Sequence, residues 1–104
     1  MPQTIRKFWG PFMGRVALNY NWNIINHDSV VLITASEYAA AVPASDEHPF
    51  VGAASITVAN ICPHGPPYDP NHGVTFVVNV DWGAPLTIVT DITVLDAPPI
   101  ETDF

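Results

Sequence analysis

Apolar and polar residues alternate along several stretches of this chain, and this period of two constrains the fold more than any other feature. Successive side chains of a β-strand point to opposite faces of the sheet, so alternation predicts a strand with one buried face. In residues 16–24 one face is apolar, and its members are Val16, Leu18, Tyr20, Trp22 and Ile24. A half-buried strand is therefore expected there.

Further segments have the length and composition of strands. Residues 30–36 are a continuous apolar run rich in β-branched side chains, and residues 55–61 form a shorter candidate. Residues 74–82 and 86–95 alternate. Because only Gly83, Ala84 and Pro85 separate these last two segments, we expect them to form a hairpin.

Helix signals are sparse. The segment from Thr34 to Glu37 has the spacing of a capping box and Pro43 would end a helix, so at most one short helical turn is expected near 35–42, unless the preceding strand continues. A parallel sheet would need crossover helices, for which the chain has no room. The expected fold is all-β: a single antiparallel β-sandwich domain over residues 1–104, jelly-roll-like or Ig-like.

The ends of the chain and two internal segments have a different composition. Residues 1–14 form an aromatic and basic N-terminal segment, whose rings are expected to pack over one end of the core. Residues 96–104 are acidic and rich in proline, which predicts an extended C-terminal arm. Residues 43–50 and 61–73 are expected to be loops because of their Pro, Gly and Asp content.

Charge is unevenly distributed in this acidic chain. Its formal net charge is −7, yet all three cations, Arg6, Lys7 and Arg15, precede Val16. Proteins bind phosphate backbones and anionic membranes through cations, so neither nucleic acid nor membrane is expected as a partner. Charged residues make up 12% of the chain, about half the usual share of roughly 25%. This favours a surface covered by another copy of the chain, a homo-oligomer.

No targeting signal is visible, because Gly10, Pro11 and Gly14 interrupt the apolar stretch that a signal peptide requires. The single cysteine excludes an internal disulfide and points to a reducing compartment. We therefore favour a cytoplasmic location, or a mature chain from which a signal has been removed.

Asn19, Asn21 and Asn23 are expected in a row on the polar face of the first strand. Amides both donate and accept hydrogen bonds, which suits the vicinal hydroxyls of a sugar, and asparagine is unfavourable in strands. The row therefore predicts a lectin-like, carbohydrate-binding face, with a protein contact or a solvated face as alternatives. The function expected from these features is that of a small non-enzymatic binding and self-association module.

The segment ICPHGPPYDPNHG, residues 61–73, offers a different site. It holds ligand types for zinc or copper, namely Cys62, His64, Asp69 and His72. Their spacing matches no zinc-finger pattern, and no nucleophile elbow supports catalysis. The competing interpretation is a stiff connection between strands, with Cys62 buried at a strand end and both histidines solvated.

These observations leave three functions in order of preference. The first is the binding module, for which no cofactor is expected. The second is a metal-binding sandwich that uses zinc or copper at the 61–73 segment, and the third is a scaffold subunit without a small ligand.

Overall fold

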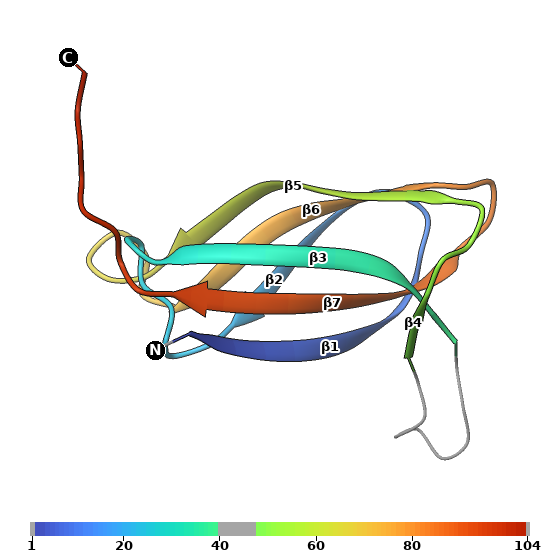
Figure 1. Ribbon diagram of the computed structural model, residues 1–104, viewed down its shortest axis with the longest axis horizontal. Coiled ribbons are helices and arrows are strands. Elements are labelled where there is room, and N and C mark those ends of the chain that lie inside the picture. Colours follow the sequence, from blue (N-terminus) through green and yellow to red (C-terminus); the bar gives the residue numbers. More distant parts are fainter. Residues whose placement is uncertain (1, 40–47, 104) are drawn as a thin grey trace.

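The structure is a computed structural model that describes residues 2–39 and 48–103, and this part of the chain is all-β, as predicted. Its strands are β1 (Gln3–Phe12), β2 (Gly14–Asn21), β3 (Val30–Ala39), β4 (His48–Phe50), β5 (Ser55–His64), β6 (Gly73–Asp81) and β7 (Leu86–Leu95) (Figure 1). No helix long and apolar enough to cross a membrane occurs among the described residues.

The strands form two antiparallel sheets. One has the order β1-β7-β3-β4 and the other has the order β2-β6-β5. Figure 1 shows the four-stranded sheet in front, with the strands of the three-stranded sheet crossing obliquely beside and behind it. Since each sheet turns one apolar face toward the other, the arrangement is a β-sandwich-like fold.

The core is filled mainly from the central strand of each sheet. On β6 the buried residues at alternate positions are Val74, Phe76, Val78 and Val80, and on β7 they are Ile88, Thr90, Ile92 and Val94. Both inward faces are those that alternation predicted. Among the described residues Thr90 is the one buried polar residue, and its hydroxyl accepts a 2.8 Å hydrogen bond from Trp9 Nε1. Its burial therefore leaves no polar group unpaired.

The predicted hairpin between β6 and β7 is wrong. β6 pairs with β2 and β5, whereas β7 pairs with β1 and β3, so residues 82–85 pass from one sheet to the other. Both strands carry strongly apolar inward faces, and these faces cover each other fully when the strands lie across the core. The chain also changes sheets between β1 and β2, where Gly14 has a φ of 70°, a conformation that glycine adopts without steric cost.

Several strand boundaries also differ from expectation. β2 ends at Asn21, so Ile24 leaves the strand and is 37% exposed, while its neighbour Ile25 is fully buried. β3 continues through Ala39 as a strand, so the helical turn near 35–42 does not form over 35–39, and residues 40–42 lie outside the described residues. Part of the predicted 43–50 loop, His48–Phe50, is β4, and residues 43–47 are likewise not described.

The two terminal segments differ in structure. Most of the aromatic and basic segment is β1, the edge strand of the four-stranded sheet, and its Trp9 and Phe12 pack against the core. Residues 96–103 have no regular secondary structure and are exposed, and Figure 1 shows them running away from both sheets.

Candidate functional site

The outer face of the three-stranded sheet brings the asparagine row together with part of the 61–73 segment. In one row across the sheet, Thr75 of β6 lies opposite both Asn19 and Cys62. In the next row, Gly73 lies opposite both Asn21 and His64. Residues directly opposite each other on paired strands project to the same face. This group of Asn19, Asn21, Cys62, His64 and Thr75 is named the polar face.

A β-bulge places the β5 residues on this face. Ala59 lies opposite Val77 and Cys62 lies opposite Thr75, so Asn60 and Ile61 together occupy the space of a single partner residue. Asn60 has a φ of 54°, in the left-handed region that asparagine tolerates better than most residues. One extra residue in a strand moves every side chain that follows it to the opposite face of the sheet. The bulge therefore turns His64 outward and Ile61 toward the core.

Gly73 allows His64 to reach across the central strand. His64 Nε2 lies 2.8 Å from Asn19 Oδ1, although β6 runs between their two strands. A Cβ atom at Gly73 would lie 2.5 Å from the backbone oxygen of Tyr20, closer than real contacts allow. The absence of a side chain here lets β2 lie close to β6, in the row in which Gly73 lies opposite both Asn21 and His64.

Asn19 is the centre of the hydrogen-bond network on the polar face. Its Oδ1 faces His64 Nε2 and also accepts a hydrogen bond from Thr75 Oγ1 at 3.0 Å. Its Nδ2 donates a hydrogen bond to Asn21 Oδ1 at 2.8 Å. The other ring nitrogen of His64 lies 2.7 Å from the backbone oxygen of Asn71.

Two proton states of His64 fit this network. With both ring nitrogens facing oxygens, the imidazolium ring donates through each of them. A neutral ring fits after the amides of Asn19 and Asn21 rotate by half a turn, because Asn19 Nδ2 then donates to His64 Nε2. The network thus stays connected in either state.

A compact loop over residues 65–72 supports His64 from the side. The N–H groups of Tyr68 and Asp69 donate to the oxygen of Gly65 at 3.2 and 3.0 Å. Asp69 Oδ1 accepts from the N–H of Asn71 at 2.8 Å and lies 3.9 Å from His64 Nδ1. The carboxylate therefore stabilises the turn that presents the Asn71 oxygen to the ring.

The remaining sequence-predicted residues lie apart from this network. Asn23 is in the turn after β2, so the amide row has two members rather than three. The Nδ1–H of His72 donates to the backbone oxygen of Ile25 at 2.8 Å, and the oxygen of His72 accepts from the N–H of Trp22 at 2.9 Å. His72 thus joins the 65–72 loop to the turn after β2.

The expectation that Cys62 is buried and that both histidines are solvated is wrong. Cys62 is exposed, because the bulge turns it outward, and each histidine is hydrogen-bonded to a backbone oxygen. Within the described residues, no group of three or more His, Cys, Asp or Glu side chains is placed to hold a metal ion. The zinc or copper site at Cys62, His64, Asp69 and His72 stays a prediction without geometric support.

A bidentate ion pair lies on the opposite side of the molecule. On the outer face of the four-stranded sheet, Arg6 donates to both carboxylate oxygens of Asp91, at 2.7 and 2.9 Å. These hydrogen bonds hold the pKa of Asp91 below its usual value and raise that of Arg6. The polar face holds no Lys, Arg, Asp or Glu, which suits it to a neutral ligand.

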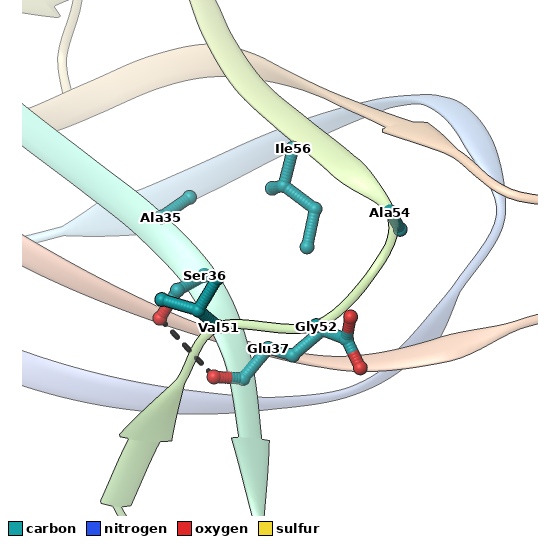
Figure 2. A pocket seen from close by; sticks show the side chains of 7 residues that line it. All are labelled: Ala35, Ser36, Glu37, Val51, Gly52, Ala54 and Ile56. Carbon is teal, nitrogen blue, oxygen red and sulfur yellow. Dashed lines mark hydrogen bonds between the residues drawn. The ribbon is translucent and has the colours of Figure 1, made fainter.

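A separate pocket of about 140 Å³ lies where β3 passes β5. Figure 2 shows Ile56 and Ala35 projecting toward it and the Glu37 carboxylate beside Gly52. A Cβ atom at Gly52 would collide with that carboxylate. The volume is below the range of roughly 300–1,000 Å³ that small-molecule sites occupy. The pocket therefore admits only a small group.

Sequence reasoning missed the parts of the site that depend on pairing. Thr75 belongs to the polar face, and Gly73 lies between Asn21 and His64, only because β6 lies between β2 and β5. The sole sequence signal was a glycine at a strand end. Comparison of the chain with protein-family models, with curated proteins and with solved structures finds no match. The interpretation of the polar face therefore rests on its geometry.

Proposed function

We propose that the chain is a non-enzymatic binding module whose polar face takes a neutral polyhydroxylated ligand, a carbohydrate. The observation that carries the proposal is the linked set of Asn19, Asn21 and His64, which are held by one another on an exposed strand face. A sugar site needs donors and acceptors fixed before the ligand arrives, because ordering them on binding costs free energy.

Hydrogen-bonding capacity is left over on the polar face. In the arrangement in which Asn19 Oδ1 faces His64, Asn19 Nδ2 has a second N–H, and among the described residues no hydrogen bond is found for Asn21 Nδ2. Thr75 Oγ1 has free lone pairs after it donates to Asn19. Two amide donors next to a hydroxyl acceptor match adjacent hydroxyl groups of a sugar ring, which can accept from one neighbour and donate to the next.

The shape of the face supports weak recognition of a single sugar. Asn19, Asn21 and Thr75 are all exposed, and none of them lines the pocket between β3 and β5. Weak individual sites gain avidity when several copies act together. A module of this kind is therefore most effective when it self-associates.

The test is binding to a glycan array with the wild-type chain and two matched variants. Asn21→Ala removes one amide of the network, and we expect about a fivefold loss of affinity, since a hydrogen bond contributes roughly 1 kcal/mol. Asn79→Ala is the control, because Asn79 lies on the same sheet opposite Arg15 and Thr57, away from the polar face. It should bind as the wild type does.

Two results would overturn the carbohydrate proposal. One is an array without any hit for a sample whose circular dichroism and cooperative melting show that it is folded. The other is equal loss of binding in Asn21→Ala and Asn79→Ala, which would place the sugar elsewhere.

A further inference from the structure

The free edges of the two sheets are protected to different degrees. A strand edge with unpaired N–H and C=O groups can pair with another chain, and natural proteins block such edges with prolines, bulges, charges or very short strands. β1 has a bulge between Phe8 and Pro11, and β4 is only three residues long. β5 contains both a bulge, at Asn60, and a proline, Pro63, and it also contacts β3.

β2 has none of the structural blocks. It pairs with β6 in unbroken register from Gly14 opposite Val80 to Asn21 opposite Gly73, and Arg15 is its only charged residue. On its other side no strand among the described residues pairs with it. β2 is therefore the one long, regular and open edge in this part of the molecule.

The register shows which backbone groups of β2 are free. The N–H of Trp22 donates to the oxygen of His72, directly opposite in the β2–β6 register. Alternate residues of an antiparallel strand turn their N–H and C=O to the same neighbour, so even-numbered residues bond to β6. The outward-facing groups are then those of Arg15, Ala17, Asn19 and Asn21.

We propose that two copies of the chain pair antiparallel through β2, about a twofold axis at Leu18, to give one continuous six-stranded sheet. Centring on Leu18 sets Arg15 opposite Asn21 of the second copy and Ala17 opposite its Asn19. All four outward-facing residues are then paired, and no charged side chain meets its own copy. The twofold axis is perpendicular to the sheet, so both polar faces lie on the same side of the dimer.

Charge and burial both favour this contact. Two copies that each carry a formal net charge of −7 repel one another, and β2, which has one cation and no acid, adds no acidic side chain to the contact. The inward side chains Val16 and Tyr20 are only partly buried at this open edge. In the proposed register Val16 packs against Tyr20 of the second copy, which covers both. The inference goes beyond the proposed sugar binding and does not depend on it.

The dimer is tested by sedimentation velocity over a range of concentrations up to about the millimolar range. A one-strand contact lies at the small end of interface sizes. We therefore expect a monomer of 11.3 kDa at low concentration that becomes a particle of twice that mass on concentration. A monomer at every concentration overturns the proposal.

The variant Ala17→Pro tests the free edge of β2 without changing the pairing of β2 with β6. The substitution removes an outward N–H without touching the bonds to β6, and proline is tolerated on a free strand edge. We expect the dimerisation constant to weaken at least tenfold with little change in melting temperature, while Ala17→Val, which keeps the N–H, dimerises as the wild type does. A dimer unchanged in Ala17→Pro overturns the proposal, and if that variant fails to fold the charge variants decide.

The charge variants test the register. R15E N21K sets opposite charges directly across the proposed contact, whereas R15E A17K has the same net charge without that pairing. We expect R15E N21K to dimerise at least about threefold more tightly, since each cross-strand ion pair adds to the contact. Equal affinities in the two double variants overturn the proposed register.

Discussion

The polar side chains on the outer faces of the two sheets find their hydrogen-bond partners in different ways. On the four-stranded sheet, polar side chains pair with residues directly across neighbouring strands, as Arg6 does with Asp91 and Thr4 does with Thr93. On the three-stranded sheet, His64 passes over Gly73 to reach Asn19 two strands away. The first arrangement satisfies its own groups, whereas the second leaves donors and acceptors unused.

This difference teaches where a binding face can arise on an otherwise regular sheet. A directly opposed pair is complete in itself and offers little to a ligand. A network that spans three strands needs a residue without a side chain in the middle and a shift of register at one edge. On the three-stranded sheet, Gly73 and the bulge at Asn60 supply these two features.

The largest effect is expected at Gly73. Gly73→Val places side-chain atoms against the backbone of β2, where even a Cβ atom would lie 2.5 Å from the Tyr20 oxygen. We expect a loss of about 3 kcal/mol or more in the free energy of unfolding, at the upper end of overpacked sites. Urea denaturation measures it. The control is Gly83→Ala, where a Cβ atom meets nothing within 4 Å; similar losses in the two variants would contradict the role given to Gly73.

A smaller effect is expected at the bulge. Asn60→Val introduces a β-branched residue at a φ of 54°, which costs roughly 1–2 kcal/mol. Asn60→Gly should be neutral or slightly stabilising, because glycine adopts this conformation freely. Thermal unfolding of both variants tests the conformation, and equal stabilities would show that Asn60 does not hold a left-handed backbone.

The ion pair on the four-stranded sheet should contribute less to the free energy of unfolding, and its contribution should depend on pH. Arg6 lowers the pKa of Asp91 in the folded state, so the pair stabilises the fold above the unfolded pKa of aspartate, near 3.9. That contribution is lost as the pH falls through the lower, folded pKa of Asp91. Asp91→Asn should therefore melt below the wild type at neutral pH and converge with it in acid. A gap that persists at low pH would exclude the ion pair as its cause.

The smallest effect is expected at Cys62. Its side chain is exposed, so Cys62→Ser should change the free energy of unfolding by less than about 0.5 kcal/mol. In the folded wild type a thiol reagent should label Cys62 without denaturant.

Removal of metal with EDTA should leave the melting temperature unchanged, and stoichiometric zinc or copper in the purified protein would instead support the metal alternative.

Alternation was enough to predict the all-β fold and the inward faces of β6 and β7. It could not decide how those strands pair, because a three-residue link fits a hairpin as well as a crossing between sheets. The facing of Cys62 and His64 depends on the backbone angle of one residue, Asn60, which no period reveals. Half of the candidate site was visible as an amide row, while its connection to His64 required the register of three strands.

The passage of the chain between sheets has a consequence for how the fold can form. Among the described strands β1 pairs with β7 alone, so that Gln3 pairs with Val94, 91 positions later in the sequence. Pairings this distant are entropically costly to close, and folds dominated by them form slowly. During synthesis the hydrogen bonds between β1 and β7 can form only after β7 has been made. Until then the apolar side chains of β1 are not buried against their final partners. We therefore expect the nascent chain to be more prone to aggregation than the folded domain.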